Sequence, residues 1–585
     1  MTLRAVTRPA TPDKAGYARQ GLQQVPRLLS LLDREGASAS AGSFDREHWG
    51  WKFRDFPMTM LQTAVYPLAL LWRQAVPGNE YHRNARVLEW IGRAMRATFA
   101  RQHANGAFDS VAPFSQDHGV TLAVMHHLCE TARVLGSDLP SGLHQQLRDA
   151  TQRACRFAER SREDYAFISN HQALFALAWL SAGELLADGR CLRQARGVVD
   201  RILSRQSSDG WYPEYGGPDP GYESLGISYL AKYWQRTGDA DVLESLKRSV
   251  QFLSYCVHPD GGIGGVYGSR HTSLYFPAGF EILTSEIPLA AAIARFVGER
   301  LAAANVVTPA TTDMHNLAPL LTSYLEAALA QREHPQPPPL PCEELQGVKH
   351  FPDSGITVAG TPAYYAVANA RKGGVCRIFD RRNGTLAYED AGYLIRTGNR
   401  SWISQMLGTG EPAEPGQPTV AACQTTFALY RQPSATPLNF GALRILNLTL
   451  FRHAALGAWI RNWIIQRLIT RARLGPLRLH RTFTFGPEAI TISDSIKLTR
   501  PIKVDEVLRP RLLTGIHMGS ARYFHGSDLL TLPEAAVSEM AAQLNRSGEA
   551  FCSFSLQFQP GGEDRATTAV DTTAIRDATQ SPVLP

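Results

Sequence analysis

The sequence predicts a two-domain α+β multidomain protein: an N-terminal incomplete (α/α) toroid followed by a C-terminal antiparallel β-sandwich. Apolar residues recur at helical spacing through residues 57–332, whereas short β-branched and aromatic segments separated by turns fill residues 345–565. A proline-rich stretch separates these two regions. The chain has 585 residues, which is long enough to bury two large cores.

The helical half contains a weak internal repeat. Helical spacing is clearest in residues 121–135, 171–187, 241–256 and 288–304. The loop and helix that begin at Arg101 match those that begin at Arg205, and the glycine-rich residues 258–269 echo the start of both. Helical hairpins cannot bury their apolar faces alone, so they must stack into an array or close into a ring. Because the long loops recur on one side, we expect a closed ring with a loop-lined cleft; an open solenoid is the alternative.

The remaining segments complete the domain plan. Residues 1–56 form an extension that we expect to pack on the toroid of residues 57–332. Consecutive prolines in residues 333–344, EHPQPPPLPCEE, hold an extended linker that is incompatible with a helix. The β-sandwich follows over residues 345–565. The tail, residues 566–585, has few large apolar side chains, and we expect it to be flexible.

One segment of the second half does not fit the strand pattern. Residues 457–473 place tryptophan, isoleucine and leucine at helical spacing, with arginines mostly on the opposite side. Such a helix fits peripheral contact with an anionic membrane surface. The alternative is a helix packed against the sandwich, with its arginines in solvent.

The composition is that of a folded chain with a positive net charge. Hydrophobic residues make up 44% and charged residues 19%, with a formal charge of +7 and a pI near 9.0, which favours acidic partners. No basic block, phosphate-binding loop or nucleic-acid motif occurs, so we expect no nucleic-acid partner. The eight cysteines are scattered, as reduced thiols are, and no cofactor or metal motif is evident. The amino terminus has no signal-peptide pattern, so we expect a cytoplasmic or membrane-associated protein.

Three motifs point to a known family. Asn170 and His171 precede a long apolar helix, DGWYPEYGGPDPGYESLG (209–226) follows the next helix, and FPDSGI (351–356) opens the sheet half. Together with the two-domain plan, these motifs resemble the heparinase II/III-like polysaccharide lyases over nearly the whole chain. The stretch FDREHWGWKFRDFP (44–57) is similar to uncharacterised members found with bacterial exopolysaccharide genes.

The resemblance implies β-elimination on a chain that contains uronic acid. Removing the C5 proton requires a group that neutralises the carboxylate, a base, and an acid for the glycosidic oxygen. In the family pattern, Asn170 and His171 meet the carboxylate and Tyr222 is the acid or base. The sheet-domain histidine motif of characterised members is missing, so His171 or His271 would supply the imidazole, with His350 as the nearest sheet-domain replacement. The alternatives are a helix cap at Asn170 and a packed aromatic at Tyr222.

Four further residues are candidates for substrate binding. Arg270 has the planar fork that pairs with a carboxylate, and Trp211 and Tyr215 suit stacking on sugar faces. Glu223 lies in the same loop region and supplies a carboxylate. The alternatives are a loop salt bridge for Arg270 and a structural role for Trp211.

The partner that we expect is an acidic polysaccharide or oligosaccharide, cleaved by β-elimination. A glycoside hydrolase on the same scaffold needs two carboxylates about 5–10 Å apart. The available carboxylates for that reaction are Asp117, Glu214, Asp219 and Glu223. The same sequence features also fit a C5-epimerase, or a non-catalytic glycan-binding or assembly factor in exopolysaccharide synthesis.

Overall fold

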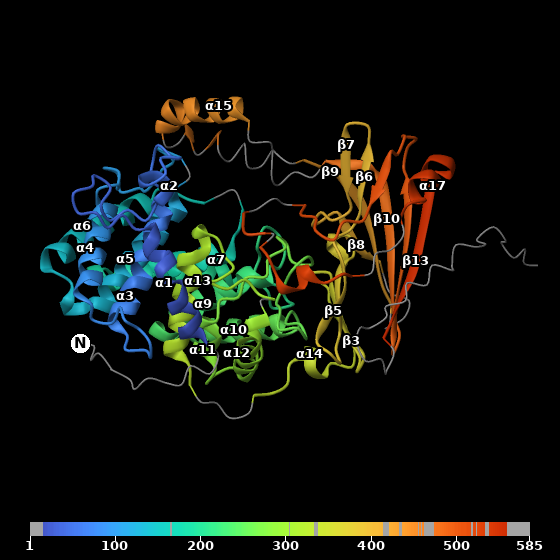
Figure 1. Ribbon diagram of the computed structural model, residues 1–585, viewed down its shortest axis with the longest axis horizontal. Helices are drawn as coiled ribbons and strands as arrows, with labels where there is room; N and C mark the ends of the chain where they lie inside the picture. Colours follow the sequence, from blue (N-terminus) through green and yellow to red (C-terminus); the bar gives the residue numbers. More distant parts are fainter. Residues whose placement is uncertain are drawn as a thin grey trace, which may run out of the picture.

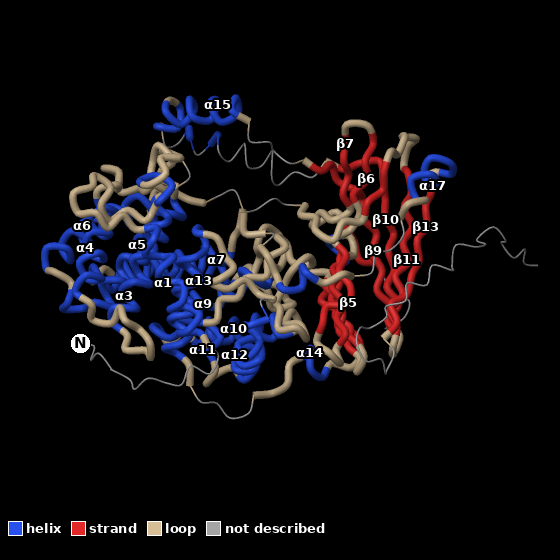
Figure 2. Tube along the Cα trace, in the orientation of Figure 1, coloured by secondary structure: helices blue, strands red, loops and turns tan. Residues whose placement is uncertain are grey.

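The structure is a computed structural model that describes residues 16–558 except 111, 164–165, 304, 333–336, 414–419, 432–435, 454–455, 458, 461–472, 516–518, 522 and 533–536. Helices and strands occupy separate halves of the molecule (Figures 1 and 2). The helices of the first half are α1 (Tyr17–Leu31), α2 (Arg46–Trp49), α3 (Val65–Arg73), α4 (Ala85–Phe99), α5 (His118–Leu135), α6 (Ser141–Ala158), α7 (Ser169–Leu186), α8 (Gly189–Leu203), α9 (Pro220–Thr237), α10 (Ala240–Ser254), α11 (Ala278–Leu283), α12 (Pro288–Arg300) and α13 (Met314–Ala330).

These helices form two concentric layers. The inner helices α3, α5, α7, α9, α11 and α13 contact one another in that order, and α13 also contacts α3, so the ring closes. Outer helices cover them, for example α8 on α7, α10 on α9 and α1 on α13. Helix α7 is buried on all sides from Ser169 to Gly183 apart from His171, whereas α8 buries a single stripe, as inner and outer positions require. The toroid is confirmed and the open solenoid is excluded.

The second half is built from two antiparallel sheets. One has the order β1-β2-β3-β4-β5, and the other has the order β12-β6-β7-β9-β10-β11-β13 with β8 paired to β9. The strands are β1 (Gly347–Phe351), β2 (Ile356–Gly360), β3 (Tyr364–Asn369), β4 (Val375–Asp380), β5 (Thr385–Asp390), β6 (Leu394–Thr397), β7 (Arg400–Ile403), β8 (Gly410–Ala413), β9 (Val420–Tyr430), β10 (Leu474–Phe485), β11 (Ala489–Leu498), β12 (Glu506–Leu508) and β13 (Glu549–Gln557). Short helices α14 (Pro341–Glu344), α15 (Pro437–Leu448) and α17 (Met540–Ser547) complete the half. The prediction that residues 333–344 are incompatible with a helix is wrong at their end, because Pro341 begins α14 at a position where no backbone N–H is needed.

The first sheet lies between the toroid and the second sheet (Figure 1). Every residue of β2, β3 and β4 is buried. On one face, Tyr365 and Val367 join the toroid core that contains Phe252. On the other face, Tyr364 and Ile378 pack with residues of the second sheet. A sheet covered on both faces explains why these strands are mostly apolar instead of alternating.

Polar contacts fix the sheet domain on the toroid. The Tyr365 hydroxyl donates to the Tyr255 carbonyl over 2.7 Å, and the Asn369 amide donates to the Tyr267 carbonyl over 2.8 Å. The fully buried positions of Tyr365 and Asn369 show that this contact belongs to the interior of the protein. The sheet domain therefore holds the loop that begins at Gly264, which belongs to the site described next.

Candidate active site

The candidate site lies where α7 and α9 begin and where residues 264–276 cross their ends. Asp219 caps α9 by accepting a hydrogen bond from the Tyr222 backbone N–H. A Cβ added to Gly226 would lie 3.7 Å from the Asn170 Cα, an ordinary contact distance, so α9 lies beside the start of α7 without requiring glycine there. A Cβ at Gly221 would lie 2.5 Å from the Thr272 hydroxyl oxygen. The close crossing of α9 and residues 264–276 therefore requires glycine at position 221.

Asn170 is the second residue of α7, not its cap. The N-cap residue is Ile168, which makes no side-chain capping bond. Glu214, in the loop that precedes α9, caps the helix instead. Its Oε1 accepts hydrogen bonds from the Asn170 backbone N–H over 2.7 Å, from the Asn170 side-chain amide over 2.8 Å and from the Ser169 hydroxyl over 2.6 Å. The helix start is satisfied by a carboxylate 44 residues away in sequence, a contact that local sequence rules do not reveal.

Arg270 stands at the centre of the site as an internal ion-pair partner. Its Nε donates to the Asp219 carboxylate over 2.9 Å and a terminal nitrogen donates to Glu214 over 2.8 Å. Arg270 is 3% exposed and both carboxylates are fully buried. The prediction that Arg270 clamps a substrate carboxylate is therefore wrong, because two carboxylates of the protein itself already occupy its fork. The salt-bridge alternative is correct.

Two tyrosines flank the Arg270 guanidinium. Its central carbon lies 3.9 Å from the ring centroid of Tyr222 and 5.1 Å from that of Tyr215. Burial raises the pKa of Tyr222, and the opposing effects of Arg270 and a hydrogen bond with Ser520 do not cancel it. Burial likewise raises the pKa of Tyr215 to about 12. Both phenols are therefore protonated near neutral pH, so Tyr222 is suited to donating a proton rather than accepting one.

His171 is paired with Glu163, a residue that sequence reasoning missed. Its Nδ1 lies 3.0 and 3.1 Å from the two Glu163 carboxylate oxygens, and its side chain is 39% exposed. Burial lowers the pKa of His171, but the charge of Glu163 and this hydrogen bond outweigh it and the net shift is upward. Because Nδ1–H points to Glu163, the neutral ring carries its lone pair on Nε2. His171 can therefore accept a proton from a ligand.

His271 is less suited to act as a base. Burial, together with the charges of Lys372, Arg377 and His525, lowers the pKa of His271 to about 3. An imidazole with so low a pKa is neutral but accepts a proton poorly. Its backbone φ of 58° is in the left-handed region, and its Nδ1 is buried without a hydrogen-bond partner among the described residues.

Trp211 and Glu223 face the interior of the toroid, so both substrate-binding predictions are wrong. Trp211 is 7% exposed and packs within the toroid core, where its ring cannot stack on a sugar. Glu223 is 1% exposed and accepts from the Ser249 hydroxyl over 2.7 Å. Burial raises the pKa of Glu223 well above its usual range. Both residues are close in sequence to the loop that carries Glu214 and Asp219, but their side chains pack into the interior of the toroid.

The sheet domain contributes a residue that the sequence did not suggest. The Lys372 ammonium donates to the carbonyls of Val266 and Gly268, over 2.8 and 2.6 Å. It thereby holds the loop that carries Arg270. Burial lowers the pKa of Lys372 to about 7. The sequence feature that could have drawn attention to Lys372 is NARKGG (369–374), in which Asn369 caps the short helical turn that contains Lys372.

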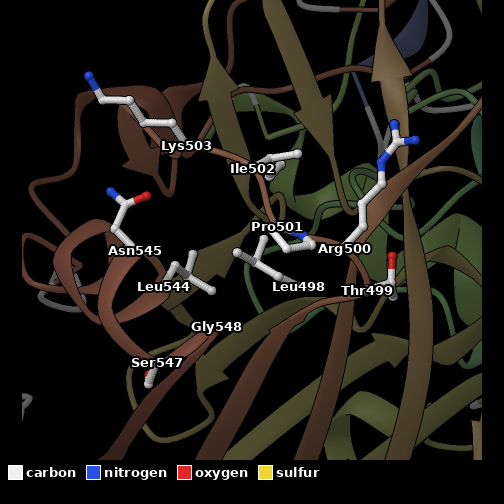
Figure 3. Close-up of a pocket in the computed structure, with 10 residues that line it drawn as sticks. All are labelled: Leu498, Thr499, Arg500, Pro501, Ile502, Lys503, Leu544, Asn545, Ser547 and Gly548. Atoms are coloured by element: carbon white, nitrogen blue, oxygen red, sulfur yellow. The ribbon is translucent and has the colours of Figure 1, made fainter.

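Neither His350 nor a surface hollow on the sheet domain belongs to this site. His350 lies on β1 and is bonded to Thr357 of the neighbouring strand, over 3.0 Å. A hollow of about 730 Å³ lies between the end of β11 and α17 (Figure 3), and none of the predicted site residues lines it. Among the described residues no group of three or more histidines, cysteines or acids could hold a metal ion.

Comparison with known proteins relates the architecture to solved structures. No protein-family model and no curated protein matches the sequence. A chondroitin AC lyase of Streptomyces coelicolor A3, solved with chondroitin sulphate, superposes with a TM-score of 0.51 at 13% identity, over 86% of this chain and 69% of that one. A Paenibacillus xanthan lyase superposes with a TM-score of 0.50 at 11% identity, over 85% of this chain and 47% of that one.

The chain thus spans about half the length of the xanthan lyase and about two thirds of the chondroitin AC lyase. At this level of identity the likeness concerns the arrangement of helices and strands. The predicted resemblance is confirmed in that respect: the chain has the polysaccharide-lyase fold of a helical toroid followed by an antiparallel β-sandwich.

Proposed function

We propose that this protein cleaves an acidic polysaccharide containing uronic acid by β-elimination at the candidate site. The observation that carries the proposal is that Asn170 and Tyr222 meet at one buried ion pair, with His171 next to Asn170 at the start of α7. Asn170 bonds to Glu214, Glu214 bonds to Arg270, and the guanidinium lies 3.9 Å from the Tyr222 ring centroid. The fold, shared with two polysaccharide lyases, supports the same reaction class.

Each step has a group suited to it. Asn170 is 3% exposed and its side-chain amide spends one N–H on Glu214; in this proposal the second N–H, which has no partner among the described residues, donates to the substrate carboxylate. The His171 Nε2 takes the C5 proton; the electrons of the C5–H bond form the C4–C5 double bond, and the bond from C4 to the glycosidic oxygen breaks. Tyr222, protonated near neutral pH, gives its proton to the departing oxygen.

The ion pair gives the site its electrostatic character. Arg270 keeps Tyr222 and Tyr215 in place through its two ring contacts, while Glu214 and Asp219 together more than offset its single positive charge. This arrangement also argues against a glycoside hydrolase, because Glu214 and Asp219 are fully buried and bound to the same arginine. Neither carboxylate is placed to protonate a glycosidic oxygen or to attack a sugar.

The test is near-ultraviolet absorbance during incubation with a panel of uronic-acid polysaccharides. We expect a rising signal from the unsaturated product in the wild type, and a loss of about 10²-fold or more in Tyr222→Phe and in His171→Ala. Tyr81→Phe and His350→Ala are matched controls outside the site and should keep the wild-type rate.

Different outcomes would indicate a different activity. Deuterium uptake from heavy water into the sugar, with no rise in absorbance, would indicate a C5-epimerase. New reducing ends without the chromophore would indicate a hydrolase. Glycan binding with neither signal across the panel would overturn the enzymatic proposal in favour of a binding or assembly role.

A further inference from the structure

Helix α15 projects from the protein with large apolar side chains in solvent. Figure 1 shows it above α2, at the outer edge of the helical half. The exposed fractions of its large side chains are unusual for a folded protein: Leu438 85%, Phe440 61%, Leu443 41%, Ile445 65% and Leu448 49%. Exposed apolar residues are ordinary when scattered, but a group on one element marks an interaction surface.

The apolar character of α15 extends around the helix. Of its twelve residues only Asn447 is buried, and Arg444 and Leu446 are half-buried. At 100° per residue, Leu438 and Ile445 point to the same side of the helix, about 20° apart, whereas Phe440 points to nearly the opposite side. A helix that is apolar on nearly all sides is stable only in apolar surroundings, and the described part of this chain does not provide them.

A second exposed element adjoins α15. Trp51 is 63% exposed and Phe53 is 76% exposed, and their rings stack with centroids 5.9 Å apart. Arg444 of α15 donates to the Asp55 carboxylate over 2.9 Å and lies over the Phe56 ring at 5.3 Å. This contact ties α15 to residues 51–56. We call the exposed side chains of these two elements the apolar surface: Trp51, Phe53, Leu438, Phe440, Leu443, Ile445 and Leu448.

The charge around the apolar surface is positive. Lys52 is exposed between Trp51 and Phe53, Arg452 is exposed just after α15, and Arg54 and Arg444 lie on the same two segments. Two acidic residues next to the surface are already paired: Asp55 with Arg444, and Glu47 with Arg54 over 2.7 Å. An apolar surface that is bordered by arginines, and whose acidic neighbours are neutralised, complements a layer that is apolar inside and negatively charged outside.

We propose that the apolar surface docks the protein on an anionic lipid bilayer, with α15 and the Trp51–Phe53 pair inserted at the boundary between headgroups and acyl chains. The contact is with one leaflet. Among the described residues no helix is long and apolar enough to cross a membrane. The predicted contact through 457–473 falls mostly outside the described residues; the docking elements assigned here are α15 and residues 51–53. The inference stands independently of the proposed reaction.

The experiment is co-sedimentation of the full chain with lipid vesicles. Vesicles of phosphatidylcholine alone are compared with vesicles that contain about one third phosphatidylglycerol, at low and high salt. We expect binding to the anionic vesicles that weakens with salt. The double variant Phe440→Ser/Ile445→Ser should lose about tenfold or more in partitioning, because two inserted side chains become polar. Both positions are exposed, so circular dichroism should show an unchanged fold.

The matched control changes exposed apolar residues elsewhere. Leu529 is 78% exposed and Phe551 is 58% exposed, both on the sheet half, and Leu529→Ser/Phe551→Ser should bind as the wild type does. Absence of wild-type binding to anionic vesicles, or equal binding by the α15 variant, would overturn the proposal. So would light scattering that shows a wild-type oligomer dissociated by the α15 substitutions, since a second copy of the chain would then cover the surface.

Discussion

Replacing Arg270 with methionine tests the assignment of this residue as an internal ion-pair partner. The substitution keeps much of the side-chain volume but leaves Glu214 and Asp219 without their shared cation. Glu214 retains three donors and Asp219 retains Thr272 and the Tyr222 N–H, so part of their solvation survives. Breaking a buried ion pair by removing one partner costs ~3–5 kcal/mol, and we expect a loss in that range.

The assay is urea unfolding followed by circular dichroism and tryptophan fluorescence at neutral and acidic pH. The deficit of Arg270→Met should shrink at acidic pH, where a carboxylate without a counter-ion can take up a proton. Arg86→Met, which removes the surface pair with Glu89, is the control and should change the free energy of unfolding by less than about 1 kcal/mol. A variant as stable as the wild type but with a greatly raised KM would refute the reasoning, because Arg270 would then serve the substrate.

Three further predictions follow from the same contacts. Glu163→Gln should lower the pKa of His171 and shift the rise of kcat/KM with pH to lower pH, which a pH–rate profile measures; an unmoved profile would contradict the pairing. Trp211→Ala should lower the free energy of unfolding by ~3–5 kcal/mol and leave the KM of the folded enzyme unchanged. A raised KM with unchanged stability would instead indicate that Trp211 stacks on the substrate. The pKa of Lys372 is about 7 in the folded protein, so above that pH the unfolded chain binds more protons than the folded one. The free energy of unfolding of the wild type should therefore rise relative to that of Lys372→Met between pH 7 and about pH 10. If the two proteins instead show the same dependence of unfolding free energy on pH, the low pKa of Lys372 is excluded.

The candidate site was partly predictable from the sequence. Asn170, His171 and Tyr222 were identified by their motifs, and the structure brings all three to the start of α7 and α9. The roles of the residues around them were harder to predict from the sequence. An arginine such as Arg270 can pair with a substrate carboxylate or with carboxylates of the protein, and the sequence does not distinguish the two. In the same way, an aromatic side chain such as Trp211 can stack on a sugar or pack in a hydrophobic core.

The sequence by itself determined the division into a helical and a sheet domain, because apolar periods of 3.6 and 2 residues are local properties of the chain. The tertiary structure alone decided which charges meet. Glu214, Asp219 and Arg270 pair across 51 to 56 residues, and Lys372 reaches the same loop from the other domain across more than 100 residues. Those contacts depend on how closely helices and loops approach, as at Gly221, and no local pattern encodes that distance.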